Sequence, residues 1–529
     1  MLSVADGKGE AGKLGMNAAD LLMWAAANAG VDLCLANPGT TEMPLVLALD
    51  RLPAIRPVLG LHETICTGAA DGYARLTGRP ALVLLHLGPG LANGLANLHN
   101  ARRARAPVVV LVGDHATWHL DADPPLAMDI RSAAGTVSRW YARLVRPEEA
   151  GRLVTEAIAA ARSGAGGVAT LVLPHDLQLE PVAEAPLATA APEPPAAPDP
   201  GALAAAAELL RGSAPGALFL GGRALHGRGL RLAGRIARAT GATLVCETGF
   251  ARLETGAGLP MVRRLPYFPE QAQALLDGFA HIVGIGARRP VSFFGWPDKP
   301  ARYLEGRAGV VWAAGPEEDA LAALETLAEE LGAGEDDPGA PFDPPDLPTG
   351  KLDGSKLAAV LARSLPEQAI VVPTAVTNAY PFSAIAHRAR PHTQLALTGG
   401  AIGEGPALAI GAALAAPGRK VINLEADGSG AYALQAFWTQ AREGLDIVTI
   451  VCANRAYRIL GLELERSGEA PGGPATRALT ALEPPAIDWV AVARGLGVPG
   501  ARAETAEDLT RILAGALREH GPFLIEAVL

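Results

Sequence analysis

Cysteine is scarce in this chain of 529 residues. The four cysteines, Cys34, Cys66, Cys246 and Cys452, lie far apart and form no Cys-x-x-Cys pair. This spacing argues against a disulfide framework and against a cysteine-rich zinc site. It is typical of a protein that works in a reducing compartment, so we expect a cytoplasmic location.

Three other features are also missing. No apolar run reaches the ~20 residues that a membrane-spanning helix needs. The net charge is −10 and no block of basic residues occurs, which argues against nucleic acid as a partner. Residues 1–15 carry acidic side chains and lack the apolar core of a secretory signal, so we expect a flexible tail there.

What is present has the balance of a globular protein, with 49% apolar and 19% charged residues. The length predicts about two to four domains. Two Pro/Ala-rich stretches, 181–200 and 332–350, cannot hold a helix or a central strand. We interpret them as linkers, and they divide the chain into predicted domains at 16–180, 201–331 and 351–529.

Each predicted domain alternates apolar, strand-like runs with helix-like runs. Examples of the strand-like runs are PALVLLHLG in the first, GALFLGG in the second and QAIVVPT in the third. Nearly continuous Val, Ile and Leu between helices indicates parallel sheets that are covered on both faces. The sequence therefore predicts an α/β protein with three doubly wound parallel-sheet domains.

The first and third domains also resemble one another. Residues 69–90, AADGYARLTGRPALVLLHLGPG, align without a gap on residues 409–430, AIGAALAAPGRKVINLEADGSG. Each segment reads as a small-residue helix, a Gly-Arg turn, a strand and a glycine-containing loop. This match predicts that the two domains are copies of one unit.

Two oxygen-bearing side chains follow consecutive strand-like runs of the third domain. Asp427 comes after VINLEA, and Asn454 comes after IVTIVCA, 27 residues later. Because parallel strands end at one edge of a sheet, both side chains can face one point. Oxygen ligands suit Mg²⁺, which often shares phosphate oxygens, and the Gly-Ser-Gly after Asp427 lets backbone N–H groups approach an anion. A loop aspartate and a turn asparagine would give the same spacing.

These residues match the signature Gly-Asp-Gly, about 27 residues and Asn, here Ala426-Asp427-Gly428 and Asn454. Four more segments agree with it: ANPGTTE (36–42), LHETICTGAADGYARLTGRP (61–80), LHLGPGLANGLANLHNA (85–101) and LTGGAIGEGPALAIGAA (397–413). Over nearly its full length the chain resembles the thiamine diphosphate enzymes. It resembles the acetolactate synthase and benzoylformate decarboxylase branch of that family. Within this branch it is most similar to the short chains named acetolactate synthase large subunits.

The resemblance implies a division of labour among the domains and a set of cofactor ligands. The first domain would bind the pyrimidine ring, the third the diphosphate, and the middle domain would be structural or hold FAD. Asp427, Asn454 and the carbonyl of Ala456 would hold Mg²⁺. The other cofactor contacts would come from Gly428, Ser429, Thr377, Ile402 and the carbonyl of Gly400. True acetolactate synthases with FAD are longer, so we expect thiamine diphosphate and Mg²⁺ here, without FAD.

The resemblance also implies two catalytic side chains. Glu63 matches the carboxylic acid that protonates the pyrimidine ring, although a glutamate at a helix start reads the same way. His86 matches the active-site histidine of benzoylformate decarboxylase, and the alternative is a buried histidine that bonds a backbone carbonyl. His115 is a weaker candidate of the same kind.

Five residues are predicted to lie on the substrate side. They are Pro38, Gly39, Thr40, Tyr457 and Leu460. A plain turn threonine is the alternative for Thr40, and core packing is the alternative for Tyr457 and Leu460.

The chain departs from the family pattern at several positions. Ala426 and Ala453 replace a glycine and an asparagine, but neither change removes a ligand. Phe293 and Phe294 stand roughly where the decarboxylase pattern has a second histidine. Around Thr374 the segment PTAVTN lacks the acidic residue that is common in the family. These losses count against efficient benzoylformate decarboxylation.

We therefore expect a thiamine diphosphate enzyme that decarboxylates a 2-oxo acid and can join the product to an aldehyde or ketone acceptor, like acetolactate synthase. A benzoylformate decarboxylase-like enzyme and a catalytically silent partner subunit remain alternatives. A nucleotide-binding oxidoreductase does not fit, because no Gly-x-Gly-x-x-Gly opens a helix. The family further implies a homodimer or a tetramer of two dimers, with each site shared between the first domain of one chain and the third domain of its partner.

Overall fold

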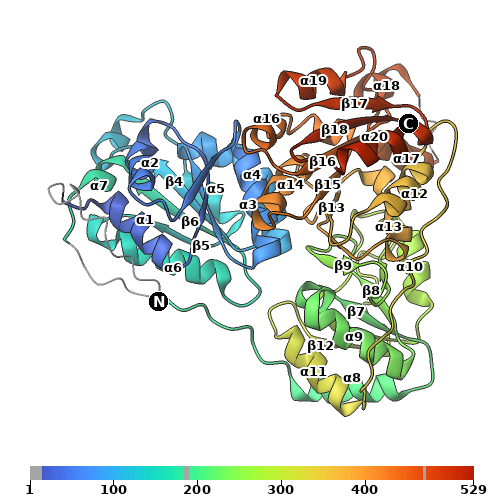
Figure 1. Cartoon of the computed structure of the whole chain (residues 1–529). Coiled ribbons are helices and arrows are strands. Elements are labelled where there is room, and N and C mark those ends of the chain that lie inside the picture. Colours follow the sequence, from blue (N-terminus) through green and yellow to red (C-terminus); the bar gives the residue numbers. More distant parts are fainter. Residues whose placement is uncertain (1–14, 184–189, 469–471) are drawn as a thin grey trace.

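The computed structural model describes residues 15–183, 190–468 and 472–529 (Figure 1). The tail predicted for residues 1–15 lies outside this part of the chain except for Gly15. Within the described ranges, no helix is both long enough and apolar enough to cross a bilayer.

The first domain is built on a six-stranded sheet whose strands all run parallel. In spatial order the strands are β2 (Arg56–Leu59), β1 (Leu33–Asn37), β3 (Ala81–Leu85), β4 (Val108–Asp114), β6 (Val168–Pro174) and β5 (Ser138–Arg143). Its helices are α1 (Ala18–Asn28), α2 (Met43–Asp50), α3 (Glu63–Thr77), α4 (Leu87–Ala104), α5 (Ile130–Gly135), α6 (Ala150–Arg162) and α7 (His175–Leu179).

Alternating side chains of the central strands fill two separate cores. Leu82 and Leu84 of β3 pack with α1, α2 and α6, whereas Val83 and Leu85 pack with α3, α4 and α5. Successive side chains of a strand point to opposite faces, so a strand with two apolar faces needs helices on both sides. This is why the continuous apolar run of β3 produces a doubly wound domain.

The middle domain has a five-stranded parallel sheet in the order β10 (Val262–Arg264), β8 (Thr243–Cys246), β7 (Gly216–Leu220), β11 (His281–Ile285) and β12 (Val310–Ala314). Its helices are α8 (Pro200–Arg211), α9 (Gly227–Thr240), α10 (Pro269–Asp277) and α11 (Ala320–Glu330). Figure 1 shows this domain, in green and yellow, beside the third domain.

The third sheet has seven strands, in the order β17 (Gly500–Ala503), β18 (Phe523–Val528), β16 (Ile447–Ala453), β15 (Val421–Ala426), β13 (Ile370–Pro373), β14 (His392–Gln394) and β9 (Leu253–Thr255). Its helices are α12 (Gly354–Ser364), α13 (Tyr380–Ile385), α14 (Gly405–Ala415), α15 (Asp427–Gly430), α16 (Gln435–Arg442), α17 (Arg458–Arg466), α18 (Pro474–Thr480), α19 (Trp489–Gly495) and α20 (Ala506–Ala516). β9 belongs by sequence to the predicted middle domain, but it pairs antiparallel with β14 at the edge of the third sheet. The sheets do not test the predicted domain boundaries, which stay predictions.

The first and third sheets share one topology. Numbered along each domain, the strands of both sheets lie in the spatial order 2-1-3-4-6-5 once β9 is set aside. The ungapped sequence match puts β3 on β15 and the end of α3 on α14. The match therefore falls on equivalent elements, as the prediction of two copies requires.

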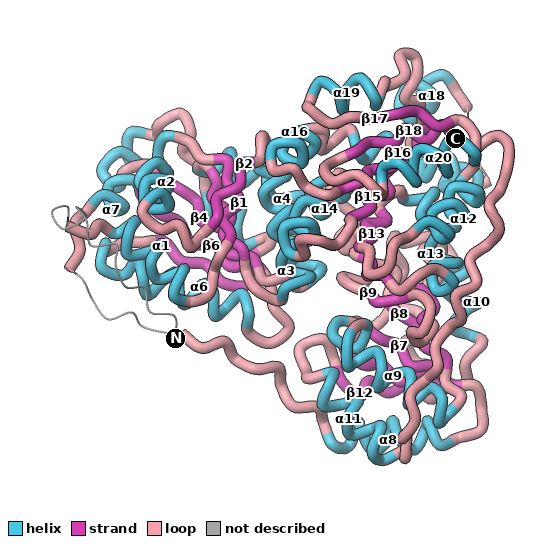
Figure 2. Tube along the Cα trace, in the orientation of Figure 1, coloured by secondary structure: helices cyan, strands magenta, loops and turns pink. Residues whose placement is uncertain are grey.

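Helices α3 and α14 join these two domains within one chain, and both views show them side by side (Figures 1 and 2). Their backbones nearly touch. A Cβ on Gly411 would lie 1.9 Å from the carbonyl oxygen of Ala69, and a Cβ on Gly72 would lie 2.2 Å from that of Leu408. Only glycine permits this approach.

A buried ion cluster lies beside the crossing. Arg75 of α3 pairs with Asp71 on its own helix and, at 2.9 Å, with Glu404 just before α14. It also donates to the carbonyl of Ala396 at 2.7 Å. Burial raises the pKa of Glu404 and Arg75 opposes the shift. Since an unpaired buried charge is costly, this cluster favours one relative placement of the two domains.

We expect Gly411→Ala to destabilise the protein by roughly 1–3 kcal/mol, because the added methyl group forces α3 and α14 apart. The matched control is Gly515→Ala in α20, where a Cβ meets nothing within 4 Å. The control should be neutral or stabilise by up to ~1 kcal/mol. Urea unfolding of both variants checks this, and equal midpoints would contradict the close crossing.

Candidate functional site

Asp427 and Asn454 lie together at the carboxyl edge of the third sheet. Ala426, the last residue of β15, is in register with Cys452 of β16, so both strands end at the same level. The Asp427 carboxylate accepts hydrogen bonds from the backbone N–H of Arg455 at 2.6 Å and of Gly428 at 2.9 Å. The expected convergence of the two strand ends is therefore present.

The oxygen atoms at this edge have the chemistry of a hard-cation site. Burial raises the pKa of Asp427, and the two backbone N–H donors oppose the shift. The Asn454 side-chain oxygen accepts the N–H of Ala456 at 3.1 Å, which holds the turn that carries the Ala456 carbonyl. The described residues contain no group of three or more His, Cys, Asp or Glu side chains placed to hold a metal. The available donors, one carboxylate with carboxamide and carbonyl oxygens, fit Mg²⁺.

The residues predicted to contact the rest of the cofactor lie among closely packed glycines. Ser429 is buried, and its hydroxyl accepts the N–H of Gly403 at 3.0 Å. A Cβ on Gly428 would lie 2.6 Å from the Tyr457 ring. Gly400 has a φ of +81°, which suits glycine. Ile402 and Thr377 are half-buried.

Glu425 is a buried acid beneath this edge that sequence reasoning missed. Its carboxylate accepts the Thr374 hydroxyl at 2.8 Å and the Ala426 N–H at 3.1 Å. Burial raises the pKa of Glu425 to about 7, against hydrogen bonds from Ser429 and Thr374. A Cβ on Gly405 would lie 2.0 Å from Glu425 Oε2, so this glycine makes room for the acid.

The first domain has its own cluster at the carboxyl edge of its sheet. Pro38, Gly39 and Thr40 follow β1, and His86 follows β3, whose last residue is in register with Asn37. Glu63 begins α3, and its carboxylate accepts the Asn93 side-chain amide at 3.0 Å. A Cβ built on Gly90 would lie 3.3 Å from Glu63 Oε1 and 3.5 Å from His86 Cβ, so the two acid–base candidates flank one glycine.

Among the described residues His86 bonds side chains and no backbone carbonyl, which contradicts that alternative. Its Nδ1 lies 2.8 Å from Oε2 of the fully buried Glu42, and its side chain is 27% exposed. Glu42 was missed in the sequence, although it ends the motif ANPGTTE.

Two more histidines follow neighbouring strands of the first sheet, and neither ring bonds a carboxylate among the described residues. His115 follows β4, and among the described residues its buried Nε2 has no hydrogen-bond partner. His175, which was also missed, follows β6, and its Nδ1 lies 3.2 Å from the Thr41 carbonyl oxygen. Histidines therefore follow three neighbouring strands, a pattern that only the sheet order reveals.

The predicted substrate-side residues of the third domain are not core residues. Leu460 is 46% exposed, and Tyr457 is half-buried against Gly428. Phe293 of the middle domain is exposed, and its ring would meet a Cβ on Gly400 at 2.8 Å. Core packing is therefore the wrong reading for Leu460.

Within one chain, the first-domain residues that bond the segment 398–401 do not include Glu63. These residues are Arg75 at Thr398, His99 at Gly399 and Asn100 at Thr398 and Ala401. No hydrogen bond among the described residues joins Glu63 to the third domain.

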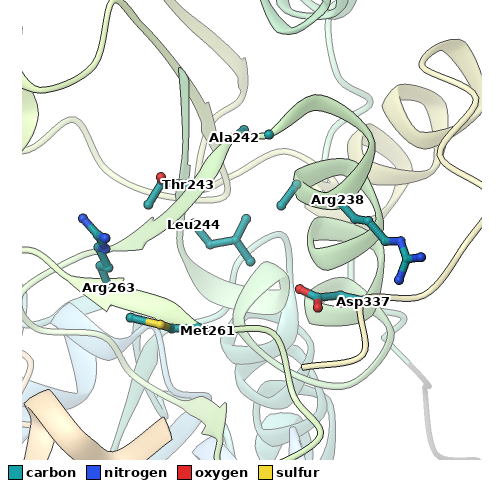
Figure 3. Close-up of a pocket in the computed structure, with 9 residues that line it drawn as sticks. Arg238, Ala242, Thr243, Leu244, Met261, Arg263 and Asp337 are labelled. Carbon is teal, nitrogen blue, oxygen red and sulfur yellow. The ribbon is translucent and has the colours of Figure 1, made fainter. Parts of the chain in front are cut away.

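Two cavities lie apart from these residues. One, of about 360 Å³, is bordered by α9, β8 and β10, with Arg238, Met261 and Asp337 among its lining (Figure 3). The other, of about 570 Å³, lies between the first and middle domains. It is rich in arginine, and burial together with nearby Arg103 and Arg105 lowers the pKa of its Arg288 to about 10. None of the predicted site residues lines either cavity.

Two family models match the domains that carry the edge residues. Residues 16–133 match the N-terminal TPP binding domain of thiamine pyrophosphate enzymes, and residues 377–527 match their C-terminal TPP binding domain. The chain belongs to the thiamine pyrophosphate enzyme family. Thiamine pyrophosphate is thiamine diphosphate, so the resemblance drawn from the motifs is confirmed.

Individual relatives of this thiamine pyrophosphate enzyme place it in the expected branch. It is 48% identical, over 97% of its length and 99% of the relative, to a Mycobacterium tuberculosis protein described as "Putative acetolactate synthase large subunit IlvX". It is 30% identical to benzoylformate decarboxylase of Pseudomonas aeruginosa, over 94% of this chain and 96% of that one. The structure of a Rhodococcus jostii thiamine diphosphate-dependent 4-hydroxybenzoylformate decarboxylase matches with a TM-score of 0.83 and 26% identity, covering 97% of this chain and 98% of that one. The predicted fold class is thus confirmed.

We expect Thr374→Val to destabilise the protein by about 1–3 kcal/mol, because the buried Glu425 carboxylate loses its hydroxyl donor. Thr449→Val in β16 is the matched control, since the buried Thr449 hydroxyl has no hydrogen-bond partner among the described residues. The control should be neutral or stabilising. If urea unfolding shows the same loss of unfolding free energy for both variants, the hydrogen bond from Thr374 to Glu425 does not stabilise the protein.

Proposed function

We propose that this protein is a thiamine diphosphate- and Mg²⁺-dependent enzyme that decarboxylates a 2-oxo acid and joins the remaining acyl unit to a carbonyl acceptor, as acetolactate synthases do. The observation that carries the proposal is the convergence of Asp427 and Asn454 at one sheet edge in a chain of this family. The overall identity of 48% to an acetolactate synthase-like relative supports the carboligase outcome.

In this proposal the third domain holds the charged end of the cofactor. Asp427, Asn454 and the Ala456 carbonyl bind Mg²⁺, which offsets the diphosphate charge. Gly428 and Ser429 contact the diphosphate, with Thr377 beside them. Gly400 and Ile402 belong to the segment that faces the rings of the cofactor. The close glycine packing around Gly428 and the positive φ of Gly400 support these roles.

Bound thiamine diphosphate supplies an electron sink for the electron pair that remains when a 2-oxo acid loses CO₂. Glu63 holds a proton for the pyrimidine ring nitrogen. The partly enclosed position of Glu63 beside Asn93 supports this role. His86 can take or return a proton at its ring, since its side chain is partly exposed at the same sheet edge as Glu63. Pro38, Gly39, Thr40, Tyr457 and Leu460 contact the substrate.

The proposed site needs two chains. Within one chain, no hydrogen bond among the described residues joins Glu63 to the third domain, and other first-domain residues bond the segment 398–401. A second copy that brings its own first domain to the third-domain edge would supply the missing acid. This supports a homodimer, or a tetramer of two dimers, with two equivalent sites.

Simple decarboxylation is the second candidate. The observation that favours it is His86, which stands at a strand end with a partly exposed ring and can deliver a proton to the product in place of an acceptor. The likeness to benzoylformate decarboxylase and to the 4-hydroxybenzoylformate enzyme supports this alternative, with an aromatic 2-oxo acid as substrate.

A product screen separates the two candidates. The enzyme, supplied with thiamine diphosphate and Mg²⁺, is incubated with a panel of aliphatic and aromatic 2-oxo acids, with and without an aldehyde or a second 2-oxo acid as acceptor. We expect CO₂ release together with a hydroxyketone product. An aldehyde as the sole product would favour the decarboxylase, and release of no CO₂ from any acid would contradict both.

We expect Asp427→Asn to lose Mg²⁺-dependent binding of thiamine diphosphate, with affinity reduced at least about 10²-fold, because the metal loses its one carboxylate. The matched control is Asp446→Asn, which lies just before β16 at the opposite edge of the same sheet. The control should bind as the wild type does. If calorimetry shows that Asp427→Asn binds thiamine diphosphate with unchanged affinity, Asp427 is not a ligand of the metal.

A further inference from the structure

The His86 ring is held by a carboxylate that has no access to solvent. Glu42 is fully buried, and its Oε2 lies 2.8 Å from His86 Nδ1. The same carboxylate accepts the Gly39 N–H at 2.7 Å on Oε2 and the Thr41 hydroxyl at 2.6 Å on Oε1. A buried carboxylate requires such partners, and here every other contact is a donor.

Two glycines make room for this pair. A Cβ on Gly113 of β4 would lie 1.6 Å from Glu42 Oε1, and a Cβ on Gly39 would lie 2.2 Å from His86 Nδ1. Leu87, directly after His86, has a φ of +51°, a strained value for a leucine. Three neighbouring strand ends are thus shaped around the contact between the imidazole and the carboxylate.

We propose that Glu42 is a positioning residue that fixes the tautomer of His86, with the proton on Nδ1 and Nε2 left as the acceptor. A carboxylate has only acceptor sites, so the ring must supply the hydrogen of the contact. Since Nδ1 faces the buried carboxylate, the exposed part of the ring is its opposite edge. A neutral His86 therefore keeps a basic nitrogen on the side of the ring away from Glu42.

The chemical use of this arrangement rests on the proposed function. With Nε2 free, His86 can accept a proton from substrate or product and return it from the same atom, while Glu42 stabilises the imidazolium that forms. A base oriented by a third group is a recurring design in enzymes. The opposite tautomer would turn Nε2 into a donor and remove its capacity to accept.

The tautomer is measured on the full-length protein labelled with ¹⁵N only at histidine. Solid-state ¹⁵N spectra are recorded at about pH 8.5, ~2 units above the ordinary histidine pKa. The chain has 11 histidines, and His86 is assigned by the signals that vanish in His86→Gln. We expect a protonated Nδ1 and a bare Nε2. A proton on Nε2 with a bare Nδ1 in the wild type would overturn the proposal, and this result needs no change at Glu42.

Glu42→Gln gives the second readout. The amide keeps the shape but offers N–H donors, so we expect the His86 proton to move to Nε2 and kcat to fall about 10²-fold, with cofactor binding retained. Asp176→Asn is the control, because it alters a half-buried acid at the same edge, where Asp176 bonds Thr117. The control should leave the His86 signals unchanged. An unchanged tautomer in Glu42→Gln would refute the positioning role.

The spectra also separate this proposal from the proposed function. The wild-type tautomer is read without substrate or turnover. If Nδ1 carries the proton but no 2-oxo acid is consumed, the pair of Glu42 and His86 stands and the proposed reaction fails. If CO₂ is released but the proton lies on Nε2, the reaction stands and the positioning role fails.

Discussion

The close crossing of α3 and α14 is the constraint on which the rest of this molecule depends. Gly72 and Gly411 let the two backbones touch, and the buried cluster around Arg75 and Glu404 favours one relative placement. The crossing joins two domains of equal topology into one unit. Within one chain, Arg75, His99 and Asn100 bond the segment 398–401, and no hydrogen bond among the described residues joins Glu63 to the third domain. In the proposed function, a second chain brings its own Glu63 to the third-domain edge.

Each outer domain brings its own polar cluster to the carboxyl edge of its sheet, and the two clusters differ in chemistry. The third domain offers oxygen ligands, with Asp427 held by backbone N–H groups above the buried Glu425. The first domain offers proton carriers, with Glu63 beside a His86 that is bound to Glu42. Equivalent strands of the shared topology thus end in one edge with oxygen-bearing side chains and one edge with acid–base side chains. In the proposed function, the cofactor spans the two.

The fold and the outline of the site could be predicted from the sequence because their signals are local. Strand ends are visible in apolar runs, and the residues that follow them, such as Asp427 and His86, reach a sheet edge by topology alone. The partners of these residues could not be predicted, since they depend on three-dimensional packing. Glu42 reads as an ordinary turn acid until Gly113 is seen to make room for its carboxylate. The antiparallel β9 was missed for the same reason, because a strand of three residues gains its partner only when two domains meet.

The most direct measurement tests whether the site is shared between chains. Chains carrying Glu63→Gln and chains carrying Asp427→Asn are co-expressed with different tags, and mixed dimers are isolated by both tags. If Glu63 of one chain serves Asp427 of the other, one site carries both changes and the other carries none. The account predicts about half of the wild-type activity in the mixed dimers, while each parent is nearly inactive. Mixed dimers as inactive as the parents would contradict it.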